Sequence, residues 1–345
     1  MVTQQPVTLR SALTAVPILL HPEVPAESGH TYSVYCIGCG GTGGWLAPHL
    51  VRRVWQLTRK WRQLQAEHPD GRFNRTIKLI FVDPDLVERK NVEARQNFLL
   101  CDIGYAKARV LATRYTLAYE GLQIEARVER FTPTWLQQHY YGTTILIDCT
   151  DNAQARIAIN DALSRNVGAK WPSVWWLSAG NGRSSGQVLL GNTTSVERLA
   201  GALRGSVCGR LPSPALIEPG LLIPQADEDV ASDANRSCED LVLADEQSPT
   251  INPHMAVWLD YYLHGLLNGG LALCGTYLSL EVGSARSVET SAQAWGRQFD
   301  VDPAFFLDPP AEPEEAVEAD TDDGEEEEDL EGELEPEEEL FGGKE

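Results

Sequence analysis

A glycine-rich segment, VYCIGCGGTGGWL at residues 34–46, holds the residue types that can bind a phosphate group. It spells G-x-G-G-x-G directly after a short β-rich run and before a helical pattern. Glycines permit a tight turn and let backbone N–H groups approach a phosphate, and the N-terminus of the following helix adds positive partial charge. The motif alone fits a dinucleotide oxidoreductase, a methyltransferase or an ATP site. The predicted phosphate-binding glycines are Gly38, Gly40, Gly41 and Gly43.

The same segment contains a C-x-x-C pair, Cys36 and Cys39. A structural zinc site would need two further ligands, normally a second C-x-x-C or a His pair, and Cys208 and Cys238 stand alone in the sequence. A thioredoxin-type pair would open a helix, whereas here more turn residues intervene. We therefore expect no structural zinc, with Cys36 in the core and Cys39 at a variable loop position.

A second group of polar residues follows the predicted strand 77–83, in FVDPDLVERKNVEARQNFL. Its first acid comes 45 residues after Gly38, whereas a dinucleotide fold usually places its ribose-binding acid about 20 residues after the glycines. Carboxylates there can accept hydrogen bonds from ribose hydroxyls, and the amide and cations can neutralise phosphates. A hydride-transferring enzyme has no need of this cluster. The candidate nucleotide-binding residues are Asp83, Asp85, Asn91, Arg95 and Lys107.

A further acid, Asp151, follows the apolar run ILIDCTD. It is predicted at the carboxyl end of the sheet, where open α/β folds bind ligands, and could hold Mg²⁺. Each candidate also has a structural alternative. The acids could close turns or cap helices, Asn91 could cap a helix, and Lys107 could lie on a solvated helix face.

Strand-like and helix-like patterns alternate through the first two thirds of the chain, which predicts a Rossmann-like, doubly wound α/β fold with a mostly parallel sheet. Residues 193–250 are rich in Pro, Ser, Asp and Glu and predict an irregular crossing region. The predicted strands are 32–37, 77–83, 122–131, 143–151, 173–180, 186–192 and 276–283, and the predicted helices are 45–68, 153–166 and 254–269.

The net charge of −22 comes mainly from one end of the chain. Residues 311–345 hold 19 Asp and Glu and one Lys, whereas the other 310 residues are nearly balanced, with 31 acidic and 27 basic side chains. We predict an N-terminal arm over residues 1–30, one folded domain over 31–308 and a disordered acidic tail over 309–345. No apolar run of 18 residues and no signal peptide is visible, and the seven scattered cysteines fit a reducing cytoplasm.

Four segments, in order, resemble the ThiF/MoeB/ubiquitin-activating-enzyme superfamily, and within it the ThiF-family proteins of the PRTRC cluster of bacterial plasmids. The resemblance covers about residues 32–192 and implies adenylation of the C-terminal glycine of a small ubiquitin-like protein with Mg-ATP. It carries the phosphate and ribose roles onto the glycines, Asp83, Asn91, Arg95 and Lys107, and the magnesium-associated role onto Asp151. The segments are GCGGTGG, VDPDLVERKNVEARQ, GYAKA and DCTDNAQARIAIN.

Two departures from the family pattern affect specific residues. The family usually has N-x-x-R-Q, and this chain is one residue longer between Asn91 and Arg95, which affects where Arg95 lies. A thioester cysteine, where family members have one, matches Cys208 better than Cys238, because Glu239 and Asp240 would raise the pKa of Cys238. A buried structural thiol is the alternative for Cys208.

We therefore expect a cytoplasmic adenylating enzyme that uses ATP and Mg²⁺, with Arg95, Lys107 and Asp151 as catalytic residues and no nucleic-acid or membrane partner. The apolar pattern of residues 254–269 is compatible with a homodimer, although burial in the core is the simpler account. Three alternatives stay open: an NAD-dependent oxidoreductase, a non-catalytic adaptor of the same fold, and an ATP-dependent enzyme acting on a small molecule or RNA.

Overall fold

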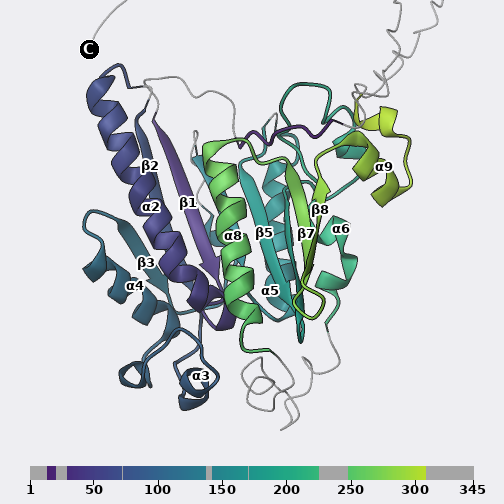
Figure 1. Ribbon diagram of the computed structural model, residues 1–345. Helices are drawn as coiled ribbons and strands as arrows, with labels where there is room; N and C mark the ends of the chain where they lie inside the picture. The colour runs from purple at the N-terminus through teal and green to yellow at the C-terminus, as the bar shows by residue number, and fades with distance from the viewer. Residues whose placement is uncertain are drawn as a thin grey trace, which may run out of the picture. The chain divides into compact units, whose positions relative to one another are not determined.

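An eight-stranded sheet forms the centre of the folded part, as Figure 1 shows. The computed structural model describes residues 14–20, 29–71, 73–136, 142–169, 171–224 and 248–307. The strand order is β3-β2-β1-β4-β5-β6-β7-β8. The first five strands in this order are parallel, and β6 to β8 continue the sheet antiparallel. The strands are β1 (His30–Ile37), β2 (Arg75–Val82), β3 (Gln123–Arg127), β4 (Gly142–Asp148), β5 (Val174–Asn181), β6 (Ser185–Gly191), β7 (Leu273–Ser279) and β8 (Ser284–Glu289).

Helices cover both faces of this sheet, which makes the fold doubly wound. The long helices α2 and α8 lie side by side on the face turned to the viewer in Figure 1, and α4 packs beside them on β2 and β3. The opposite face is covered by α5 and α6. The helices are α2 (Gly41–Glu67), α3 (Arg89–Glu93), α4 (Lys107–Ala118), α5 (Ala153–Ala162), α6 (Pro214–Ile217), α8 (Ile251–Asn268) and α9 (Ala292–Phe299).

Strand β1 shows how the sequence builds two cores from one sheet. Val34 and Cys36 point to the face under α2, whereas Tyr35 and Ile37 point to the face under α5. All four are buried, because a central parallel strand is covered on both sides. Its near-continuous apolar run therefore places the end of β1, and the glycines that follow, at a fixed point of the sheet edge.

The predicted α/β class and the mostly parallel sheet are confirmed, and most element boundaries agree to within a few residues. Helix α2 begins at Gly41, four residues before its predicted start, so part of the glycine motif is helical. The strand predicted over residues 276–283 corresponds to β7, and a further strand, β8, and the helix α9 follow it. Alternating apolar residues are absent from β8, whose side chains are mostly exposed, so no pattern identified it.

Four further predictions concern residues outside this sheet. Within the predicted N-terminal arm, residues 14–20 are described: Ile18 N donates to the Leu271 carbonyl and pairs with Cys208 in an isolated bridge. The predicted acidic tail lies outside the described residues. Helix α8 buries its apolar side against α2, β5 and β6, as the core alternative predicted. None of the described helices is long and apolar enough to cross a membrane.

Candidate nucleotide-binding site

The glycine loop joins β1 to α2 at the carboxyl edge of the sheet. Gly38 adopts a φ of +86°, and a side chain there would bring its Cβ within 2.7 Å of the Cys149 carbonyl oxygen. A Cβ on Gly43 would lie 1.8 Å from the Gly38 carbonyl oxygen. These contacts explain why the loop needs glycine, and they bring the first turn of α2 close against the end of β1. The helix N-terminus, with its free N–H groups, therefore faces the edge where ligands bind in such sheets.

Asp83, directly after β2, is locked to this loop. Its Oδ2 accepts a hydrogen bond from Cys39 N at 2.6 Å, and its Oδ1 accepts one from Asp85 N at 2.8 Å. The residue is only 5% exposed. Burial raises the pKa of the Asp83 carboxyl to about 6, although Lys107 and the two N–H donors act in the opposite direction. Asp83 therefore closes the turn at Asp85, as its structural alternative predicted, and it also contacts the glycine loop.

Lys107 begins α4 and brings a buried positive charge to the same point. Its Nζ lies 3.3 Å from Asp85 Oδ2, and its side chain is 8% exposed, against 65% for Asp85. Its backbone N–H donates to the Asp85 carbonyl, and Leu86 pairs with Ala106 in a short antiparallel bridge. The segment after β2 and the start of α4 are therefore held together. The alternative of a solvated helix face does not apply to Lys107.

The short helix α3 positions the predicted amide and arginine. Asn91 is buried, and its Oδ1 accepts a hydrogen bond from Glu88 N, so its side chain caps the start of α3. Arg95 follows the helix with a φ of 59°, and its carbonyl accepts a hydrogen bond from the Trp45 indole of α2. The exposed Arg95 side chain is thus anchored through its backbone beside the glycine loop. This left-handed backbone conformation is uncommon outside glycine.

Asp151 lies in the loop that follows β4, next to the glycine turn. The neighbouring Asp148 is fully buried; its Oδ1 accepts hydrogen bonds from Thr150 N and Oγ1, and its Oδ2 accepts one from Ser178. Arg156 lies 3.5 Å from Asp148 and donates to the Thr150 carbonyl. This buried network fixes the loop, and Asp151 is exposed at its tip. Helix α5 is capped by Asn152, whose side chain accepts from Ala155 N.

An asparagine from the far end of the chain also reaches the glycine loop. Asn252, at the start of α8, accepts hydrogen bonds from Thr42 Oγ1 at 3.0 Å and from Asn181 Nδ2 at 2.5 Å. It joins the first turn of α2 to the end of β5. Sequence reasoning missed Asn252, because spacing along the chain carries no sign of a contact made across 210 residues. It also missed Asn181 and Asp148.

The cysteines are placed differently from the other candidates. Cys36 and Cys39 are buried, and burial raises the pKa of the Cys39 thiol. Cys208 is also fully buried, and its pKa is raised to about 12, mainly by burial. It packs against residues 17–19, and its neighbour Gly209 accepts from Asn192 at the amino end of the sheet. The structure therefore does not bring Cys208 to the glycine loop, and the structural-thiol alternative accounts for it here. Cys238 lies outside the described residues.

The arrangement combines groups that a nucleotide needs. The glycine loop and the α2 N-terminus suit phosphates, Asp83 can accept from ribose hydroxyls, and Lys107 supplies a buried positive charge. In the part of the chain that the structure describes, no three His, Cys, Asp or Glu side chains are grouped so as to hold a metal ion by themselves. A lone carboxylate such as Asp151 fits a Mg²⁺ ion that arrives with phosphates, since Mg²⁺ commonly takes one or two protein carboxylates there.

The raised pKa of Asp83 predicts a pH-dependent stability. An ordinary aspartate titrates near 3.8, so between pH 4 and 6 the folded state binds more protons than the unfolded state, and the free energy of unfolding falls as the pH rises. The fall from this group is at most about 3 kcal/mol. Urea denaturation at pH 4.5, 5.5 and 6.5 should show it in the wild type and in Asp161→Asn, an exposed control, but not in Asp83→Asn. The same pH dependence in Asp83→Asn would contradict this account.

This chain is similar to a known protein family over about half of its length. The model of the ThiF family matches residues 26–199, just over half of the chain. No curated protein matches. Among solved structures, that of PaaA is 15% identical with a TM-score of 0.45 and covers 77% of this chain. The structure of Escherichia coli MccB with ATP is 13% identical with a TM-score of 0.43 and also covers 77% of this chain. This chain spans 65% of the PaaA chain and 64% of the MccB chain.

Proposed function

Because this chain belongs to the ThiF family, we propose that it uses ATP to adenylate the C-terminal glycine of a small ubiquitin-like protein. One observation carries the proposal beyond family membership: Asp83 is hydrogen-bonded to the glycine loop at Cys39 N, with the buried Lys107 beside it. A ribose acceptor, a phosphate cradle and a fixed cation are thus assembled at one edge of the sheet. A nucleotide with several phosphates uses all three.

The proposed reaction joins two anions, which defines what the site must do. A carboxylate oxygen of the terminal glycine attacks the α-phosphorus of ATP, an acyl–phosphate bond forms, and the bond from that phosphorus to the oxygen bridging to the β-phosphate breaks. Pyrophosphate leaves with the electron pair of the broken bond. Fixed positive charge lowers the barrier to such a step, because it offsets the negative charge that gathers around the phosphorus.

Five groups of this chain would divide that task. The N–H groups at the start of α2 would hold phosphate oxygens, and Lys107 would offset their charge, while the exposed Arg95 would reach the departing pyrophosphate. Asp151 would orient a Mg²⁺ ion brought by the nucleotide; bound Mg²⁺ neutralises phosphate charge. Asn91, whose Oδ1 is held by Glu88 N, would present its amide N–H group to the nucleotide.

The finer parts of the proposal rest on the sequence resemblance. We propose that the protein belongs to the PRTRC-associated branch of the family and acts in a bacterial cytoplasm. Its proposed partners are the ubiquitin-like protein and a second copy of the chain. A thioester after adenylation would need Cys208 to leave its buried position, or Cys238 to act instead. Alkylation of the intact protein with and without ATP and partner tests which thiol becomes accessible.

Ligand-dependent thermal unfolding tests the nucleotide assignment. Mg-ATP at about a hundred times its dissociation constant should add roughly 2.7 kcal/mol to the free energy of unfolding, and Asp151→Ala should reduce this gain because the metal loses its protein carboxylate. Asp161→Ala, an exposed aspartate on α5, serves as the matched control and should keep the full gain. NAD should give no shift.

Each contrary outcome would favour a different function for this protein. A shift with NAD alone would replace the proposal by an oxidoreductase. Mg-ATP could shift the unfolding temperature while small proteins that end in glycine cause no release of pyrophosphate. That result would favour an enzyme acting on a small molecule or RNA. Absence of a shift with either ligand would favour a non-catalytic adaptor.

A further inference from the structure

A cavity lies at the opposite edge of the sheet from the glycine loop. It has a volume of about 260 Å³ and is lined by segments that flank the start of β5 and the end of β6, among them Pro172 and Thr193. Strand β5 is eight residues long, so about 25 Å separates the two edges. The cavity is therefore distinct from the candidate nucleotide site.

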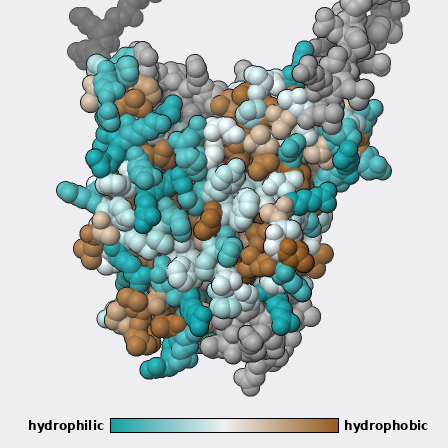
Figure 2. Space-filling model, in the orientation of Figure 1, coloured by the Kyte–Doolittle hydropathy of each residue, from teal (hydrophilic) through white to brown (hydrophobic). Residues whose placement is uncertain are grey.

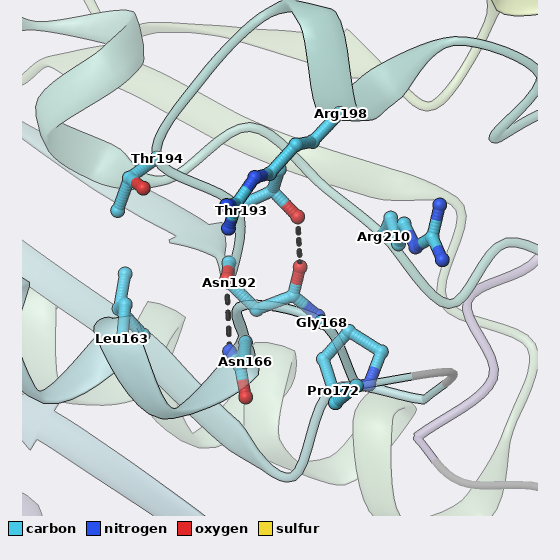
Figure 3. A pocket seen from close by; sticks show the side chains of 10 residues that line it. Leu163, Asn166, Gly168, Pro172, Asn192, Thr193, Thr194, Arg198 and Arg210 are labelled. Carbon is cyan, nitrogen blue, oxygen red and sulfur yellow. Dashed lines mark hydrogen bonds between the residues drawn. The ribbon is translucent and has the colours of Figure 1, made fainter. Parts of the chain in front are cut away.

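The walls of this cavity are held by buried hydrogen bonds. Asn192 is fully buried; its Oδ1 accepts from Thr193 Oγ1 and Leu211 N, and its Nδ2 donates to the Gly209 carbonyl. Asn166 donates to the carbonyls of Val174 and Asn192, as Figure 3 shows for the second of these bonds. The cavity thus keeps its form without a ligand, which lowers the entropy lost on binding.

Two arginines give the cavity its charge. Arg198 extends from the short 3-10 helix Glu197–Leu199 toward Thr193, and Arg210 stands on another side of the cavity (Figure 3). Among the described residues, no acidic side chain lines the cavity and neither guanidinium has an ion-pair partner. The buried Leu199 and Leu211 anchor the backbone next to each arginine. Two positive charges are thus held at one concave site of a chain whose net charge is negative.

We propose that this cavity binds the phosphate group of a small molecule. A guanidinium presents planar, paired N–H donors that match phosphate oxygens, and the two charges match a phosphate dianion. The hydroxyl of Thr194, also in the lining, adds a donor. Together these groups offer more donors than the two oxygens of a carboxylate can accept, so phosphate suits the cavity better than a carboxylate. The volume of about 260 Å³ admits a small molecule that carries a phosphate.

Titration calorimetry with inorganic phosphate tests this site on the full chain. The wild type should bind one phosphate, and Arg198→Gln/Arg210→Gln should bind it at least about tenfold more weakly, because charge-assisted hydrogen bonds are lost. Arg198→Lys/Arg210→Lys should fall between the two, since it keeps the charges but loses the paired donors. Lys107→Met, which alters the glycine-loop site, should bind phosphate at this cavity as the wild type does.

Several results would overturn the proposal. Loss of phosphate binding in Lys107→Met alone would assign the binding to the nucleotide site. Acetate binding as tightly as phosphate, at matched ionic strength, would make the cavity a carboxylate site. Equal phosphate affinity of the wild type and Arg198→Gln/Arg210→Gln would contradict a phosphate site in this cavity. Absence of binding in the wild type at 10 mM phosphate, about a hundred times a Kd of 0.1 mM, would contradict it as well. Both arginines are at least partly exposed, so the variants should unfold at the wild-type temperature.

Discussion

Gly43→Ala should abolish ATP binding and lower the free energy of unfolding by more than about 3 kcal/mol. The added Cβ would lie 1.8 Å from the Gly38 carbonyl oxygen. No side-chain rotation can relieve this contact, because the backbone fixes the position of a Cβ and the carbonyl is itself part of the backbone. Either the first turn of α2 or the end of β1 must move. Both movements displace the N–H groups that we assign to phosphate binding, and both disturb the Asp83–Cys39 hydrogen bond.

The neighbouring Gly44 gives a matched control for this prediction. It lies in the same turn of α2, but a Cβ there would meet the Cys39 carbonyl oxygen at 3.4 Å and Asn97 at 3.7 Å, which are ordinary contacts. Gly44→Ala should therefore fold normally and even gain up to about 1 kcal/mol from the higher helix propensity of alanine. Urea denaturation and ATP titration of both variants provide the measurement. Equal behaviour of Gly43→Ala and Gly44→Ala would refute the tight packing of this loop.

The sequence predicted the parts of this site that lie on regular elements. Buried parallel strands are continuous apolar runs, and the residues that follow them must lie at the carboxyl edge, so Gly38, Asp83 and Asp151 could be placed together. Burial bears on two choices that the residues left open. Lys107 is enclosed rather than solvated, and Cys208 is enclosed rather than presented to a substrate.

The contacts made between distant parts of the chain could not be predicted in the same way. Asn252 completes the glycine loop from a helix 210 residues beyond Thr42, and its identity as an asparagine says only that it needs hydrogen-bond partners. The edge strand β8 was missed for another reason: an exposed strand buries little apolar surface and shows no alternation. The left-handed backbone at Arg95 likewise follows from the hydrogen bonds of Arg95 N to Val92 and of Gln96 N to Asn91, which no single-residue preference specifies.

Lys107→Met should weaken ATP binding by about two orders of magnitude, the effect typical of losing a fixed charge aimed at an anion in a buried site. Methionine keeps the straight apolar part of the side chain and removes the ammonium group, with its charge and its hydrogen bond to Asp85. Arg109→Met is the matched control, because Arg109 belongs to the same turn of α4 but is exposed. It should change ATP affinity by less than about threefold, as expected of a solvated surface charge.

A second measurement separates loss of binding from loss of folding. Lys107 lowers the pKa of Asp83, so without it the Asp83 carboxyl should titrate above its present value of about 6. The unliganded Lys107→Met variant should then be less stable than the wild type at pH 8, where Asp83 is charged in both, and the difference should narrow toward pH 5, where Asp83 takes up a proton in both folded states. A stability difference that does not change between pH 5 and 8 would mean that Lys107 acts by packing alone, and an unchanged ATP affinity would remove it from the nucleotide site.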